Sequence, residues 1–206
     1  MDSRPSSSGR SIRKNRSEIL NFKYLKSKPS PPSRKPQAWR VESPRRHASP
    51  RLAIRRARLA DVPALLTIEH TCFPPQETLA AAQVRRLLRN PRAICLAAVG
   101  DAKTTQSNIA GWCVAFIRRH AHCRSGRIYT LAVDPMLHRQ GVGRQLLTRM
   151  LAMLRQRGVG RVYLEVRAEN RRAIAMYEEA GFEKMRRLPG HYGDGGDGVS
   201  MRMSPV

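Results

Sequence analysis

Long apolar runs are missing from this 206-residue sequence. Its longest uninterrupted apolar stretches, of which residues 93–99 are an example, fall far short of the ~18 residues that a membrane-spanning helix needs. The basic N-terminus is not followed by an apolar segment and a small-residue cleavage site, so a secretory signal is not expected. These absences exclude an integral membrane protein and make the cytoplasm the expected compartment.

Cysteine is scarce as well, and the four thiols stand at irregular spacings: Cys72, Cys95, Cys113 and Cys123. A chain of this length builds a hydrophobic core without disulfide bonds, so we expect reduced and mostly buried thiols. His120 and His122 lie close to Cys123, but no second pair of cysteine or histidine residues stands at ligand spacing. No metal site is therefore expected.

Acidic residues are the third shortage, because the chain holds 15 Asp and Glu against 39 Lys and Arg, a formal charge of 39 − 15 = +24. Residues 1–50 carry 13 basic and 3 acidic residues, with seven of the 14 prolines and eleven serines. With so little to bury, this basic Ser/Pro-rich segment is expected to be a disordered tail before a single domain over residues 51–206. Two interpretations of the tail stay open. It is a solvated leader, even an over-extended start of the reading frame, or it contacts RNA or the ribosome through phosphate groups.

From Arg51 onward the apolar periodicity becomes regular. Strands are predicted at residues 52–55, 93–99, 109–117, 127–133, 162–166, 182–187 and 199–203. Helices are predicted after an N-cap at Asp61, over about 79–88, along the apolar stripe 146–154, and over 170–180. This order predicts a mixed α/β (α+β) sheet flanked by helices.

A glycine-rich turn joins the strand that ends at Val133 to the next helix. At such a junction the unpaired backbone N–H groups and the helix dipole attract anions, and Gly141 and Gly143 let a phosphate approach the main chain. Arg139 and Arg144 flank these glycines with charges suited to a pyrophosphate. The spacing matches neither the dinucleotide fingerprint nor a P-loop, so it indicates a different phosphate-bearing cofactor. An ordinary structural turn is the alternative.

Two segments resemble a known family. The sequence Leu-Ala-Val-Asp-Pro at 131–135, followed by His-Arg-Gln-Gly-Val-Gly-Arg at 138–144, resembles motif A of the GNAT superfamily of acetyl-CoA-dependent N-acetyltransferases. Residues 164–182 are similar to the adjoining motif, particularly in the ribosomal-protein-alanine N-acetyltransferase branch. The match covers residues 51–203. It implies a GNAT-like, mostly antiparallel central sheet flanked by about four helices.

The resemblance also implies a binding site for acetyl-CoA as co-substrate. In the family the strand matching Leu131, Ala132 and Val133 splays from its neighbour, and its main chain pairs with the pantetheine arm. Asn170 would contact the cofactor near its thiol end. His138 departs from the Arg or Gln that is usual at the first motif position. The pyrophosphate would be held by the backbone of six successive residues: Arg139, Gln140, Gly141, Val142, Gly143 and Arg144.

Acetyl transfer needs a neutral amine, because an ammonium group has no lone pair to attack the thioester. An α-amino group loses its proton more readily than lysine, so a single carboxylate is a sufficient base. The resemblance implies that Glu165 is this general base and that Tyr177 protonates the departing thiolate. From spacing alone, a glutamate beside Arg167 is more often a surface ion-pair partner, and Tyr177 is a core aromatic; the family match favours the catalytic role for Glu165.

The acceptor region of that branch usually carries two adjacent tyrosines, where this sequence has His191 and Tyr192. Tyr192 is expected to line a peptide groove, and His191 to shuttle protons, because histidine is the side chain suited to proton transfer near neutral pH. The leading hypothesis is acetylation of a protein N-terminal α-amine, a ribosomal protein being one candidate acceptor. A small-molecule amine acetyltransferase and a non-catalytic RNA- or ribosome-binding protein on the same fold are the alternatives.

Overall fold

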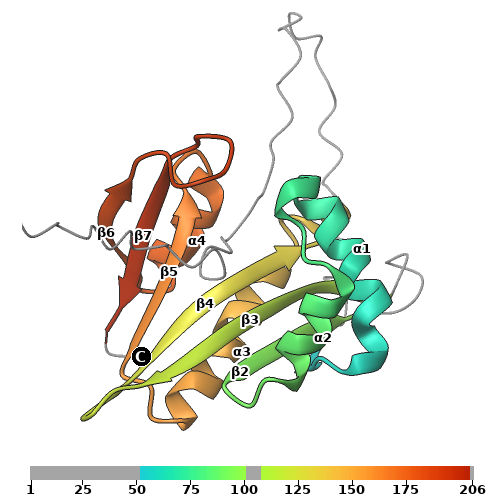
Figure 1. Cartoon of the computed structure of the whole chain (residues 1–206), viewed down its shortest axis with the longest axis horizontal. Helices are drawn as coiled ribbons and strands as arrows, with labels where there is room; N and C mark the ends of the chain where they lie inside the picture. Colours follow the sequence, from blue (N-terminus) through green and yellow to red (C-terminus); the bar gives the residue numbers. More distant parts are fainter. Residues whose placement is uncertain (1–51, 101–107, 205–206) are drawn as a thin grey trace, which may run out of the picture.

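The computed structural model describes residues 52–100 and 108–204 (Figure 1). The predicted tail at residues 1–50 lies outside the described residues, so the expectations about it stay predictions. The described chain forms one seven-stranded sheet and four α-helices. The strands are β1 (Ala53–Arg56), β2 (Ala93–Val99), β3 (Ile109–Arg119), β4 (Arg124–Val133), β5 (Arg161–Arg167), β6 (Glu183–Leu188) and β7 (Gly198–Met203). The helices are α1 (Val62–Cys72), α2 (Ala81–Arg89), α3 (Val142–Gln156) and α4 (Arg171–Glu179).

The strands follow the order β1-β2-β3-β4-β5-β7-β6, and every neighbouring pair is antiparallel except β4 with β5. That parallel pair is short, because only residues 125–127 of β4 pair with residues 161–163 of β5. Beyond these residues the two strands diverge, as Figure 1 shows. The last residues of β4 and those of β5 are therefore not paired with each other, and this interruption of the ladder is called the gap.

Two apolar layers cover the two faces of the sheet. Along β2, Ile94, Leu96 and Ala98 belong to the core beneath α3, whereas the alternate residues Cys95 and Ala97 pack with α1 and α2. This alternation follows from the two-residue period of a strand. The seven-residue apolar run of β2 is thus buried on both faces, which explains why it lacks polar positions.

The predicted order of strands and helices and the mixed, mostly antiparallel sheet are confirmed. The β3–β4 hairpin is longer than predicted, because the strands continue to Arg119 and restart at Arg124 around a tight turn. Asp61 is the N-cap residue of α1 as predicted, but its side chain does not cap the helix. Its carboxylate makes no cap hydrogen bond to α1, and it accepts hydrogen bonds from the Arg55 guanidinium, at 2.7 and 2.8 Å, and from the Arg58 N–H.

None of the helices in residues 52–100 and 108–204 is long and apolar enough to cross a membrane. Cys95 and Cys113 are buried as expected, but Cys123 is exposed in the hairpin turn. In the same part of the chain, no group of three His, Cys, Asp or Glu side chains is arranged to hold a metal ion. His120 instead contacts the Ser125 hydroxyl, with 2.8 Å between Nε2 and Oγ.

Candidate active site

The free edge of β4 faces the gap left by β5. The Asp134 N–H donates to the Ala110 carbonyl at 2.9 Å, next to the Ala132–Trp112 pair of the ladder. Because alternate residues of an antiparallel strand bond to opposite sides, the main-chain groups of Leu131 and Val133 point away from β3 and toward the gap. This is the geometry that the resemblance requires for an extended ligand pairing with β4.

The Val133 carbonyl at this edge contacts two polar side chains. The Cys72 thiol donates to it at 3.2 Å, and Nε2 of His138 lies 3.1 Å from the same oxygen. Burial lowers the pKa of His138 below its ordinary value, although the contact with Val133 opposes that shift. His138 therefore holds the first residues of the glycine-rich turn against the end of β4.

The turn that leads into α3 has two residues in the left-handed region. Arg139 has φ +67° and Gly141, the N-cap of α3, has φ +79°. Such alternation turns successive N–H groups toward one concave side, which is a binding site for anions. A Cβ added to Gly143 would lie 3.4 Å from Sδ of Met176, so this position accepts little more than a methyl group. The backbone of the turn thus fits a pyrophosphate at the N-terminus of a 15-residue helix.

The side chains around this turn contribute less than its backbone. Arg144 forms an ion pair with Glu179 of α4, and the Gln140 amide donates to the Met136 carbonyl at 3.4 Å. Arg139 is exposed and, within the described residues, makes no ion pair. Of the two flanking arginines that the sequence suggested, Arg139 is the one whose charge is not already paired.

Asn170 caps the helix that follows β5. Its Oδ1 accepts a hydrogen bond from the Ala173 N–H at 3.1 Å, and the residue is only 6% exposed. Within the described residues, its buried Nδ2 has no hydrogen-bond partner. A buried donor left unpaired costs about 1–3 kcal/mol. A ligand carbonyl that accepts a hydrogen bond from this Nδ2 would remove that cost.

Glu165 lies on β5 just beyond the paired stretch, on the part of the strand that borders the gap. Its Oε2 is 2.7 Å from a guanidinium nitrogen of Arg127 and 3.0 Å from Nε2 of His191. The carboxylate is 19% exposed, so it is partly desolvated but open to a small polar group. The arrangement places a carboxylate beside an imidazole with proton-transfer capacity, held in position by an arginine.

Tyr192 and Arg167 form the second polar cluster. The Arg167 guanidinium lies over the Tyr192 ring, 4.1 Å from its centroid, and contacts Glu77 at 3.0 Å and Asp194 at 2.9 Å. The Arg167 and Glu77 side chains are each only 3% exposed. Burial is the main cause that raises the pKa of Tyr192. This cluster fixes the β6–β7 loop, which carries His191 toward Glu165.

Tyr177 is fully buried on α4 and packs edge to face against Phe182, with 5.6 Å between ring centroids. Burial raises its pKa well above the ordinary value for tyrosine, and the nearby Cys113 and Tyr192 raise this pKa by smaller amounts. The phenol is therefore protonated at neutral pH. A proton donor and a core aromatic are compatible roles for it, as the sequence suggested.

The arrangement of β4, the turn and α3 agrees with the comparison with known families. A profile described as the acetyltransferase (GNAT) family matches residues 62–182, more than half of the chain. The chain belongs to the GNAT family. It is an N-acetyltransferase of this family, and acetyl-CoA is the acetyl donor that the family uses.

Individual relatives agree with this assignment. Ribosomal protein bS18-alanine N-acetyltransferase of Escherichia coli (strain K12) is 35% identical over 127 residues, which make up 60% of this chain and 76% of the relative. The crystal structure of the Escherichia coli ribosomal-protein-alanine enzyme matches with a TM-score of 0.61 at 27% identity, covering 75% of this chain and 94% of that one. Arabidopsis thaliana NAA60 in complex with acetyl-CoA shares the fold, with a TM-score of 0.66 at 21% identity and coverage of 74% and 98%.

Within this GNAT enzyme, the structure brings Glu165 and His191 together, which the sequence had assigned to separate roles. Glu165 does form an ion pair, but with Arg127, whereas Arg167 is engaged by Glu77 and Asp194. Sequence reasoning missed Arg127 and the buried Arg167–Glu77 pair. Only the register of β4 against β5, which places Arg127 opposite Tyr163, would have indicated the contact with Glu165.

Proposed function

We propose that this GNAT enzyme acetylates the N-terminal α-amine of a protein, with Glu165 as the general base. The observation that carries the proposal is the Glu165–His191 contact of 3.0 Å on the part of β5 that borders the gap. The 35% identity to an enzyme named for acetylating the alanine of a ribosomal protein supports this acceptor class. The cytoplasm, where acetyl-CoA and ribosomes are found, is the compartment that this function requires.

The residues present fit acetyl-CoA. The backbone of residues 139–144 would hold the pyrophosphate, and the main chain of β4 at Leu131 and Val133, which faces away from β3, would pair with the pantetheine arm. The unpaired Nδ2 of Asn170 would donate to a carbonyl of the bound ligand. Bound in this way, acetyl-CoA supplies an acetyl thioester that a neutral amine attacks.

The acceptor must lose a proton before it attacks. The α-ammonium of a polypeptide has a pKa of ~7.7–8.0, so little driving force is needed at neutral pH. Glu165 accepts the proton directly or through water, and His191 passes it from the carboxylate toward solvent. Arg127 holds the carboxylate in place. Tyr177, whose phenol is protonated at neutral pH as in any tyrosine, would be the donor to the departing thiolate.

Replacing the carboxylate tests the mechanism. We expect Glu165→Gln to lower kcat by about 10²- to 10⁴-fold, because a positioned general base contributes about this factor. Acetyl-CoA affinity should change little, since the backbone of the turn is untouched. The measurements are steady-state turnover of an N-terminal peptide and calorimetric titration of acetyl-CoA. Glu183→Gln, on an exposed carboxylate of β6, is the matched control and should leave both values unchanged. Full turnover in Glu165→Gln would remove this residue from the mechanism.

A panel of acceptors tests the substrate class. The enzyme is offered peptides with free N-termini, the same peptides with blocked N-termini, and a set of polyamines and amino acids. We expect mass spectrometry to find one acetyl group on the free N-terminal peptides only. Acetylated polyamine without acetylated peptide would favour a small-molecule amine acetyltransferase. Absence of acetyl transfer to any amine, together with salt-sensitive RNA binding, would favour a non-catalytic RNA- or ribosome-binding protein.

A further inference from the structure

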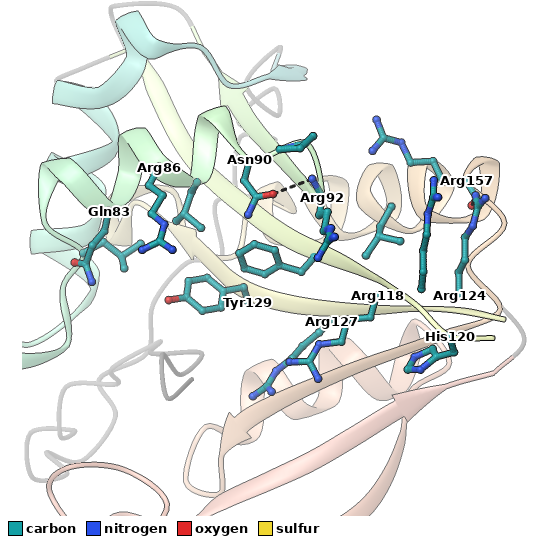
Figure 2. Close-up of a pocket in the computed structure, with 16 residues that line it drawn as sticks. Gln83, Arg86, Asn90, Arg92, Arg118, His120, Arg124, Arg127, Tyr129 and Arg157 are labelled. Carbon is teal, nitrogen blue, oxygen red and sulfur yellow. Dashed lines mark hydrogen bonds between the residues drawn. The ribbon is translucent and has the colours of Figure 1, made fainter. Parts of the chain in front are cut away.

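A wide groove of about 1040 Å³ opens between α2 and the β3–β4 hairpin (Figure 2). Its walls come from α2, the following loop, the facing ends of β3 and β4, and the end of α3. Its apolar lining residues include Leu87, Phe116 and Ile117. Seven arginines line it: Arg86, Arg92, Arg118, Arg119, Arg124, Arg127 and Arg157. No Asp or Glu stands among the described residues that line the groove.

Most of these arginines keep an uncompensated charge. Arg127 is the groove residue that contacts a carboxylate, that of Glu165, and Arg124 donates to the Arg157 carbonyl at 2.6 Å. The other five arginine side chains make no ion pair within residues 52–100 and 108–204. Like charges that gather without partners raise the potential of a concave surface, so the groove attracts anions.

Arg127 connects the groove to the proposed base. Arg127 lines the groove and at the same time lies 2.7 Å from Oε2 of Glu165. An acceptor whose amine reaches Glu165 must continue away from it, and the groove next to Arg127 offers apolar lining residues that suit a polypeptide. We propose that the groove holds the residues that follow the acceptor's N-terminus, and that it selects acidic residues there. This inference rests on the proposed N-terminal acetylation.

An acidic polypeptide fits the groove better than a nucleic acid does. Phe116 and Tyr129 pack edge to face against each other, with 5.4 Å between ring centroids and an angle of 85°. This arrangement offers no series of parallel ring faces on which successive bases would stack. Arg127 also places the groove next to Glu165, where the proposed reaction needs an amine. A polypeptide has such an amine at its N-terminus, whereas a nucleic acid has no aliphatic amine.

The charge of the groove also has a chemical consequence. Carboxylates close to an α-ammonium favour its charged form and hinder its deprotonation. Arginines that pair with those carboxylates remove this effect, so the amine of an acidic acceptor loses its proton to the base as readily as that of a neutral acceptor. The same arginines repel polyamines and basic N-termini. The groove therefore favours acidic acceptors at the binding step and at the chemical step.

Three peptides that share their first residue test the proposal. Their next five residues are acidic, neutral or basic, and kcat/KM is measured for each with the full chain. We expect the acidic peptide to exceed the basic one by about tenfold or more, with most of the difference in KM and a decline at high salt, because solvent-exposed charges are screened. Charge reversal by Arg86→Glu with Arg92→Glu should remove the preference. Arg85→Glu, on the adjacent position of α2 outside the groove, should retain it.

Peptide binding, measured by fluorescence anisotropy, separates the two proposals. If the three peptides are acetylated with equal kcat/KM, the groove does not select acidic acceptors and this inference is overturned, while N-terminal acetylation stands. If the acidic peptide binds in an Arg86-dependent way but is never acetylated, selectivity of the groove stands and N-terminal acetylation is rejected. If no peptide binds but an oligouridine binds in an Arg86-dependent way, the groove is an RNA site and the inference is wrong.

Discussion

At the scale of single residues, Arg167 shows how a charge is kept in the interior. The guanidinium is surrounded by the Glu77 and Asp194 carboxylates and by the face of the Tyr192 ring. An isolated buried charge is expensive, but a paired and hydrogen-bonded one is tolerated. The cluster joins β5, the segment before α2 and the β6–β7 loop, so it fixes the loop that supplies His191.

Removal of Arg167 should be strongly destabilising. We expect Arg167→Met to lower the free energy of unfolding by ~3–5 kcal/mol, because Glu77 then loses its buried ion pair with Arg167. Urea denaturation followed by circular dichroism measures the change. The double variant with Glu77→Met should recover part of the loss, since both charges are gone.

Lys184→Met provides the comparison, because the Lys184–Glu178 ion pair is exposed. Such pairs contribute ~0–1 kcal/mol, so this variant should unfold almost like the wild type. Equal losses in Arg167→Met and Lys184→Met would show that burial does not strengthen the interior pair.

The contacts of single residues were the part of the site that the sequence predicted least well. Glu165 could be chosen because its strand alternates, with Val162, Leu164 and Val166 buried as predicted and Glu165 half-buried on the other face. Its partners Arg127 and His191 could not, because they are 38 and 26 residues away along the chain. Long-range pairs depend on strand register and loop placement, which a local pattern does not contain.

At the scale of elements, periodicity predicted the helices and strands but not which strands pair in the sheet. The apolar run of β2 and the stripe of α3 are strong local signals. The ends of β3 and β4 were predicted too short, because the arginines and histidines near the hairpin turn do not alternate with apolar residues. The position of β7 between β5 and β6 is a matter of long-range pairing, and no turn residue indicates it.

The junction of β4 and α3 provides an element-scale test. Gly143→Glu places a long, negatively charged side chain in a turn where a Cβ already approaches Met176 to 3.4 Å. We expect calorimetry to detect no acetyl-CoA binding, because the carboxylate repels the pyrophosphate and occupies its place at the N-terminus of the helix. Gly160→Glu is the control, since a Cβ there has no neighbour within 4 Å.

Circular dichroism of both glycine variants distinguishes a lost site from a lost fold. The prediction requires a native spectrum for Gly143→Glu together with absent binding, and unchanged binding for Gly160→Glu. Normal affinity in a folded Gly143→Glu protein would mean that the pyrophosphate is held elsewhere.

At the scale of the whole molecule, the sheet connects two apolar cores. Leu147 of α3 is buried in one and Leu65 of α1 in the other, on opposite faces of the same strands. Since β2, β3 and β4 contribute alternate residues to both cores, neither layer has a sheet of its own. The two cores are therefore expected to unfold as one cooperative unit.

Two probes test this cooperativity. Trp112 is fully buried in the α1–α2 core and donates to Glu69 at 2.9 Å, so its fluorescence reports on that core. The sequence has two tryptophans, and Trp39→Phe removes the other one from the signal. We expect Leu65→Ala and Leu147→Ala each to cost ~2–5 kcal/mol, because both leave a cavity. Each should shift the fluorescence and circular dichroism transitions in urea together, whereas Leu59→Ala, on an exposed side chain, should shift neither by much. If Leu65→Ala moves the fluorescence transition to lower urea while the circular dichroism transition stays in place, the α1–α2 layer unfolds on its own.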